Sequence, residues 1–134
     1  FHQDITTENR LKACEVMEFL GISTLADVDM GELSFGQKKL LDLGAVLMAD
    51  PDLILLDEPA AGVNLRLLED IINKLVILKN QGKTILLIEH NMDLVMGISD
   101  EVIVMSAGNV IAQGKPSEIQ KNTEVLEAYL GGKA

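Results

Sequence analysis

Two short, unbroken apolar runs constrain the fold of this chain most strongly. Residues 53–56 read LILL and residues 84–89 read TILLIE, without the polar alternation of a half-buried strand. Between them, residues 65–80 carry apolar side chains at helical spacing, and Gly82 is the expected end of that helix. Strands that alternate with helices in this way predict an α/β fold whose sheet is covered on both faces.

The rest of the chain extends this pattern. We expect a first helix capped by Thr6 or Thr7, running to about residue 20 and ended by Gly21, and a second that Ser34 caps and that runs to about residue 49. Ala107-Gly108-Asn109 is typical of a hairpin turn. The other expected helices and the two strands of the hairpin span residues 91–98, 101–105, 110–113, 116–120 and 124–130.

Composition excludes several classes of protein. The 134 residues are 48% hydrophobic and 24% charged, which is typical of a globular domain and not of a disordered one. The net charge of −10 argues against nucleic acid or an anionic lipid surface as the main partner. Cys14 is the only cysteine, so an intrachain disulfide is impossible and a reducing compartment fits. No apolar run reaches the roughly 18 residues of a membrane span, so we expect no direct membrane insertion.

Two adjacent acids, Asp57 and Glu58, end the first apolar run. Neighbouring carboxylates repel each other, so a cation or hydrogen-bond donors are expected nearby. An aspartate at the carboxyl end of a parallel strand is well placed to hold Mg²⁺, with phosphate oxygens completing the shell. The next residue can polarise a water for attack on phosphorus, so the pair suits phosphoryl transfer. The alternative is an ordinary polar strand end that starts a loop.

Three further segments carry candidate residues. Residues 33–37 read LSFGQ at a helix start, where free N–H groups favour an anion and Gly36 lets a phosphate approach closely. Residues 60–64 read AAGVN, a loop of small residues suited to close backbone contact. His90 follows the second apolar run and could sense a γ-phosphate. The plain alternatives are a capped helix, a connecting turn and a surface histidine.

In their order along the chain, these segments resemble the second half of an ABC-type ATP-binding subunit. They correspond to that family's signature, Walker B strand, D-loop and switch histidine. DEPAAGVN, IEHNMDLVMGISDEVIVM, GNVIAQGKPSEIQKN and VLEAYLG are similar to the subunit for branched-chain amino-acid uptake in bacteria, and the resemblance runs from about residue 6 to residue 131. It implies a partial P-loop NTPase fold, with a mostly parallel sheet, flanking helices and a C-terminal hairpin. Residues 1–50 would form the last part of the helical subdomain. Residues 51–134 would form the catalytic core with the C-terminal helices.

The resemblance also implies a role for each motif residue. Asp57 would hold Mg²⁺, Glu58 would be the general base, and His90 would contact the γ-phosphate of ATP. Gly62 and Asn64 would belong to the D-loop. The signature residues, which would touch the ATP bound by the opposite subunit, are Ser34, Phe35, Gly36 and Gln37.

Some positions depart from the family pattern. Phe35 stands where glycine or another aromatic is more common, and Asn64 where many relatives have aspartate. Positions 44 and 45 hold Gly-Ala where an Ala-Arg pair is common, so the arginine that would make an interfacial or structural ion pair is missing. The phosphate-cradling loop G-x-x-x-x-G-K-[ST] does not occur in this sequence. Gly82-Lys83-Thr84 does not qualify, because it precedes a strand and has Ile77 where the first glycine is required.

The missing loop favours the C-terminal part of a longer subunit, inactive on its own. The intact subunit would hydrolyse MgATP between two ATP-binding subunits, as a homo- or heterodimer. With transmembrane permease subunits it would drive branched-chain amino-acid import, on the inner, cytoplasmic face of the bacterial plasma membrane.

Two other functions stay open for such a sequence. One is a non-catalytic module for interaction or dimerisation, and the other is an ABC ATPase for another cargo, such as lipid export. Absence of the strand that bears the phosphate loop also predicts an unpaired apolar edge and self-association.

Overall fold

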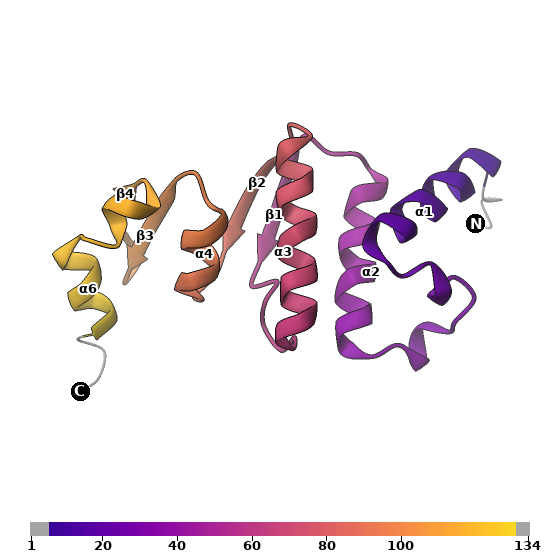
Figure 1. Cartoon of the computed structure of the whole chain (residues 1–134), viewed down its shortest axis with the longest axis horizontal. Helices are drawn as coiled ribbons and strands as arrows, with labels where there is room; N and C mark the ends of the chain where they lie inside the picture. The colour runs from indigo at the N-terminus through magenta and orange to yellow at the C-terminus, as the bar shows by residue number, and fades with distance from the viewer. Residues whose placement is uncertain (1–5, 131–134) are drawn as a thin grey trace. The chain divides into compact units, whose positions relative to one another are not determined.

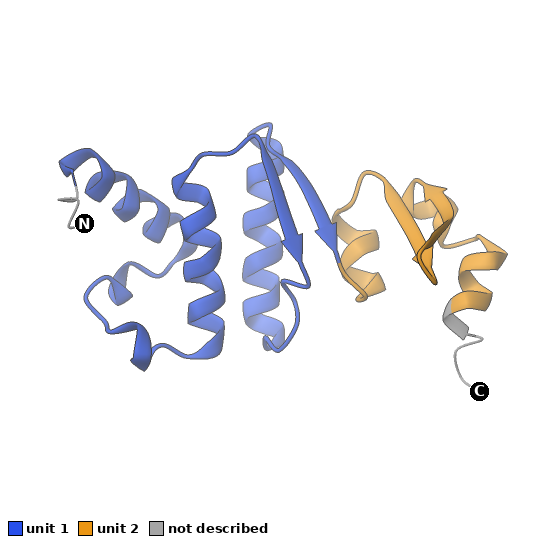
Figure 2. Ribbon diagram, turned by 180° about the vertical axis from the view of Figure 1, so that it is seen from behind, with its two compact units in different colours: residues 1–88 blue, residues 89–134 orange. Residues whose placement is uncertain are grey.

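The structure, a computed structural model, describes residues 6–130 (Figure 1). It divides into two compact units, residues 1–88 and residues 89–134, which are described separately below (Figure 2). The expected division of the family's fold at residue 50 stays a prediction. Gly131, with which the family resemblance ends, lies outside the described residues.

Three long helices and a pair of strands dominate the described part of the first unit. Thr6 caps the first helix, since its Oγ1 accepts a hydrogen bond of 3.2 Å from the N–H of Asn9, and Gly21 ends it in the left-handed conformation. Every boundary expected from the sequence holds to within one residue. In chain order the elements are α1 (Thr7–Leu20), the 3-10 helices η1 (Ser23–Leu25) and η2 (Met30–Glu32), α2 (Phe35–Met48), β1 (Leu53–Asp57), α3 (Leu65–Asn80) and β2 (Thr84–Ile88).

The helices α1 and α2 pack closely at a glycine. Gly44 of α2 is buried, and a Cβ added to it would lie 3.0 Å from Cδ1 of Leu20 and 3.5 Å from Cγ1 of Val16. The glycine that departs from the family pattern therefore makes room for the last turns of α1. Leu11, near the start of α1, is 61% exposed, because this contact lies near the other end of the helix.

Strands β1 and β2 are parallel, with Leu53 opposite Thr84 and Asp57 opposite Ile88. Helix α3 covers one face of the pair, as the two opposite views show (Figures 1 and 2), and Ile54 is fully buried. The buried residues of α3 are Ile71, Leu75 and Leu78, whereas Val76 is 36% exposed.

The other face of this strand pair is open in the described residues. Successive strand residues point to opposite faces, and Leu53, Leu55, Leu86 and Ile88 are 52–64% exposed. We call these four residues the open sheet face. Within the first unit, the expectation of a sheet covered on both faces is therefore wrong, because the described helices of this unit pack on one side of the strands only.

The second unit is a hairpin with short helices around it. Strands β3 and β4 are antiparallel, and Ala107 and Gly108 turn between them with φ of +47° and +80°. The buried core is formed by Val102, Val104, Ile119 and Val125. This confirms the C-terminal hairpin. The elements are α4 (Met92–Ile98), β3 (Val102–Ser106), β4 (Asn109–Gly114), α5 (Pro116–Ile119) and α6 (Thr123–Leu130).

Candidate functional site

The two acids lie at the carboxyl end of β1, where the chain leaves the sheet. Asp57 is the last residue of the strand, and both acids are exposed. The N–H of Glu58 donates to the carbonyl of Ile88 at 2.9 Å, and its carbonyl accepts from the N–H of Ala61 at 3.1 Å. Glu58 has φ of +45°, a left-handed conformation that costs about 1–2 kcal/mol for a residue with a Cβ. The backbone thus turns sharply between the two carboxylates.

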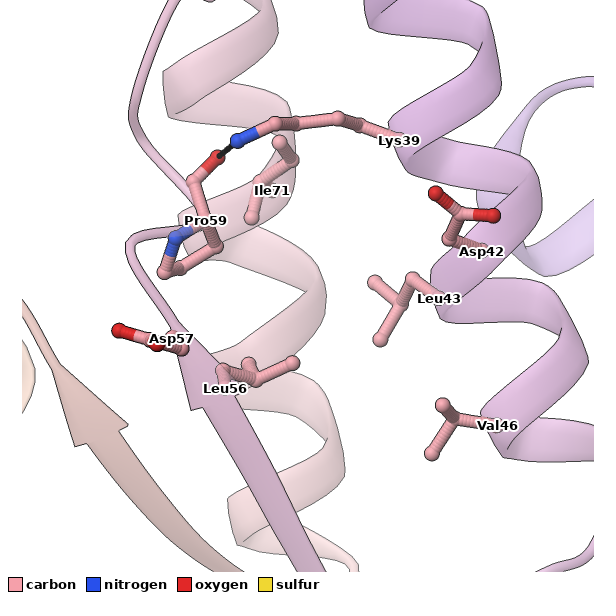
Figure 3. Close-up of a pocket in the computed structure, with 8 residues that line it drawn as sticks. All are labelled: Lys39, Asp42, Leu43, Val46, Leu56, Asp57, Pro59 and Ile71. Atoms are coloured by element: carbon pink, nitrogen blue, oxygen red, sulfur yellow. Dashed lines mark hydrogen bonds between the residues drawn. The ribbon is translucent and has the colours of Figure 1, made fainter.

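A lysine from α2 reaches this turn. Nζ of Lys39 donates to the carbonyl oxygens of Glu58 at 3.0 Å and of Pro59 at 3.3 Å, and the second bond is drawn in Figure 3. The same nitrogen lies 5.5 Å from the centroid of the Phe35 ring, one helical turn earlier. Lys39 was not among the site residues predicted from the sequence. Its only signal is a basic residue one turn beyond the start of the signature helix.

The start of α2 is a capping box made by two signature residues. Oγ of Ser34 accepts from the N–H of Gln37 at 3.4 Å, and Oε1 of Gln37 accepts from the N–H of Ser34 at 2.8 Å. The N–H groups of Phe35 and Gly36, in the first turn, have no carbonyl four residues back within the helix. The capping box uses the N–H groups of Ser34 and Gln37 and leaves those of Phe35 and Gly36. A capped helix and an anion site are therefore compatible here.

The structure brings the signature together with the D-loop of the same chain. A Cβ added to Gly62 would lie 2.9 Å from Cε1 of Phe35, and one added to Gly36 would collide with Cδ2 of Leu67. Gly62 also has φ of +73°, which favours glycine. Asn64 caps the start of α3, where its Oδ1 accepts from the N–H of Leu67 at 3.0 Å. Close packing thus explains both glycines and the aromatic ring of the signature.

A hollow of about 200 Å³ lies between α2, β1 and α3 (Figure 3). Its walls are mostly apolar and include Leu43, Leu56 and Ile71, with Lys39 at the rim. Leu56 points toward Leu43 on α2, whereas the carboxylate of Asp57 points away from them. Asp57 is one of the residues that line the hollow, but its carboxylate points away from Leu43 and Leu56, as the alternation along a strand requires.

Asp57 fits one particular kind of metal site. In the part of the chain that the structure describes, no three histidine, cysteine, aspartate or glutamate residues gather closely enough to hold a metal ion. Mg²⁺ is commonly held by one or two carboxylates, several waters and the phosphates of a substrate. The exposed carboxylate of Asp57 fits a Mg²⁺ ion that arrives with a nucleotide, and it does not fit a site built from protein ligands alone.

Two other residues singled out in the sequence are Lys83 and His90. Lys83, of the Gly-Lys-Thr triplet, lies directly before β2. Its Nζ donates to Oδ1 of Asp50 at 2.7 Å. This ion pair gives the lysine a structural role, and the triplet comes at the start of a strand, as predicted from the sequence. His90 is exposed and belongs to the second unit, between the end of β2 and α4. Its contact with a γ-phosphate stays a prediction.

Comparison with known proteins agrees with the motifs. The sequence profile of a family described as "ABC transporter" matches residues 3–61, and that of "Branched-chain amino acid ATP-binding cassette transporter" matches residues 109–134. The chain is 44% identical over 124 residues to the probable branched-chain amino acid transport ATP-binding protein LivG of Methanocaldococcus jannaschii, covering 90% of this chain and 48% of that protein. The chain belongs to the ABC-transporter ATP-binding family.

Other members of this ABC family give the same result. The high-affinity branched-chain amino acid transport ATP-binding protein LivG of Escherichia coli (strain K12) is 37% identical over 121 residues, covering 90% of this chain and 48% of that protein. A crystal structure of the ADP conformation of an ABC-transporter ATP-binding cassette superposes with a TM-score of 0.84 at 41% identity, covering 94% of this chain and 51% of that one. The chain thus spans about half the length of the relatives it matches. Among the described residues, no helix is long and apolar enough to cross a membrane.

Proposed function

We propose that this chain supplies part of the ATP-hydrolysing subunit of an ABC importer for branched-chain amino acids. The observation that carries the proposal is the turn at Asp57 and Glu58. It places two acids at the carboxyl end of a parallel strand, tied by Lys39 to the helix that begins with the signature. The names of relatives that are 37–44% identical support this cargo over lipid export.

The two acids have different roles in this proposal. Asp57 is a ligand of a Mg²⁺ ion bound with ATP, which neutralises charge on the phosphates. Glu58 orients the attacking water and accepts its proton, which fits an exposed carboxylate held on a strained turn. His90 contacts the γ-phosphate.

The proposed subunit works as a pair. The signature residues touch the ATP bound by a second ATP-binding subunit, since the first turn of α2 offers free N–H groups to an anion. These residues are Ser34, Phe35, Gly36 and Gln37. Gly62 and Asn64 form the D-loop beside this signature. The pair acts with transmembrane permease subunits, on the inner face of the bacterial plasma membrane.

The test compares substitutions of the two acids in a complete cassette. We define the chimeric cassette as the M. jannaschii relative in which this chain replaces the matching segment. Glu58→Gln keeps the shape of the side chain and removes its basicity, so we expect turnover to fall about 100- to 10,000-fold while ATP is still bound. Asp57→Asn should instead weaken the Mg²⁺-dependent part of ATP binding. Both are read from ATP turnover and from ATP binding with Mg²⁺ and with EDTA.

Glu69→Gln on the exposed side of α3 is the matched control and should leave turnover at the parental value. Near-parental turnover by Glu58→Gln would overturn the role of the base. Binding by Asp57→Asn that keeps its full Mg²⁺ dependence would overturn the role of the metal ligand.

One observation favours a second function for the chain taken alone. The open sheet face is an apolar surface of the kind that associates with another protein surface. In the absence of the phosphate loop, this function would be association without catalysis. Calorimetry tests this second function, because the chain alone should bind ATP with a dissociation constant weaker than about 1 mM, or roughly 4 kcal/mol of binding free energy. Micromolar binding by the chain alone would contradict this.

A further inference from the structure

The turn that carries Glu58 is held in a conformation that its own sequence disfavours. A residue with a Cβ is rarely left-handed, and a residue that precedes proline is biased toward extended backbone. Glu58 precedes Pro59 and nevertheless has φ of +45°. Such a conformation persists only where surrounding contacts over-determine it.

Three hydrogen bonds to the backbone of Glu58 supply this constraint. Its N–H donates to Ile88 of the neighbouring strand at 2.9 Å, and its carbonyl accepts from Ala61 inside the turn at 3.1 Å. The third bond comes from another element, the ammonium of Lys39 on α2, at 3.0 Å. That ammonium also binds the carbonyl of Pro59 at 3.3 Å, so it holds two consecutive peptide groups of the turn at once.

We propose that Lys39 is a positioning residue for Glu58, which fixes the turn so that the carboxylate faces the reacting water. This inference rests on the proposed role of Glu58 as the base. A hydrogen bond from a charged donor is stronger than one between neutral groups, so the ammonium of Lys39 is well suited to hold this strained turn. Since Lys39 lies one turn after Phe35, it also joins the turn to the signature that would touch the second ATP.

The experiment measures kcat and KM for ATP, together with Tm, in the chimeric cassette. Lys39→Met removes the ammonium and keeps the length of the side chain, while Lys39→Arg keeps a cationic donor. Lys38→Met is the matched control, because it makes the same chemical change one residue earlier on the same helix. Glu58→Gln, alone and combined with Lys39→Met, shows whether the lysine acts through the acid.

We expect Lys39→Met to lower kcat about tenfold, equivalent to about 1.4 kcal/mol of barrier, with KM for ATP within about twofold of the parent. Lys39→Arg should restore most of kcat, and Lys38→Met should match the parent. In the Glu58→Gln background, Lys39→Met should have little further effect. If Lys39→Met leaves kcat unchanged, lowers it equally in both backgrounds, or lowers only Tm, the positioning role is wrong. If Glu58→Gln itself keeps parental turnover, the base assignment fails and this inference fails with it.

Discussion

The packing of Phe35 on Gly62 allows a quantitative test of how the signature and the D-loop are joined. Gly62→Ala makes two changes at once: it forces an alanine to adopt φ of +73°, and it places a Cβ 2.9 Å from Cε1 of Phe35. The left-handed backbone costs about 1–2 kcal/mol for alanine. The smaller backbone entropy of the unfolded chain offsets about 0.4–1 kcal/mol of this.

Gly21 provides a control for the backbone cost alone. It has the same φ of +73°, and a Cβ added there would meet nothing within 4 Å. Gly21→Ala should therefore lower the free energy of unfolding by the backbone cost only, roughly 0–1.6 kcal/mol. Gly62→Ala adds the displacement of the Phe35 ring. Overpacking costs about 1–3 kcal/mol, and we expect the lower end because the ring is 59% exposed and can move outward.

The assay is urea unfolding of the chimeric cassette, followed by circular dichroism. We expect Gly62→Ala to be about 1 kcal/mol more destabilising than Gly21→Ala. In a Phe35→Ala background the two glycine substitutions should cost the same, since the ring is no longer there to be displaced. Equal losses in the parental background, or an excess loss that survives Phe35→Ala, would refute the contact between the signature and the D-loop.

Two further predictions concern the ends of the strand pair and its open face. The hydrogen bond from Lys83 to Asp50 holds the pKa of the Asp50 carboxyl below its usual range, so its contribution to stability is complete above about pH 4 and is lost as the pH falls through the lowered pKa. Asp50→Asn should therefore lower Tm at pH 7 and converge with the parent in acid, and a difference in Tm that is constant with pH would contradict this. Leu55→Lys, on the open sheet face, should reduce self-association of the isolated chain in analytical ultracentrifugation. Leu11→Lys, at an equally exposed leucine of α1, should not, and equal effects of the two would contradict association through this face.

Local chemistry made the elements predictable from the sequence. Ser34 and Asn64 each place a side-chain oxygen on an N–H three residues later, and Gly21 adopts the left-handed conformation that ends a helix. These signals act within four residues, so one sequence is enough to find them. The two apolar runs similarly indicate the strands, because short unbroken apolar runs bounded by turn residues are typical of buried strands.

Contacts between elements were much less predictable. An unbroken apolar run indicates that both faces of a strand need cover, but it does not say which face the described chain itself covers. Leu55 and Leu56 are identical in type and adjacent, yet Leu55 is 64% exposed and Leu56 faces the hollow. The conformation of Glu58 opposes the local rule for a residue before proline. It is set by Ile88 and Lys39, 30 and 19 residues away in the sequence, where no local pattern can indicate it.

The departures from the family pattern become understandable only as pairs of contacting residues. Phe35 is an unusual signature residue until its ring is found against Gly62, where any side chain larger than hydrogen would displace it. Gly44 is an unusual residue for a helix, and its close contact with the side chain of Leu20 on α1 explains it. In both pairs a glycine on one element accepts a bulky side chain from another, so the pair and not the single position is the unit that sequence change must conserve. A motif role can therefore be carried over directly where it depends on backbone capping, as for Ser34. Where the side chain packs on another element, as for Phe35, it can be carried over only together with its partner.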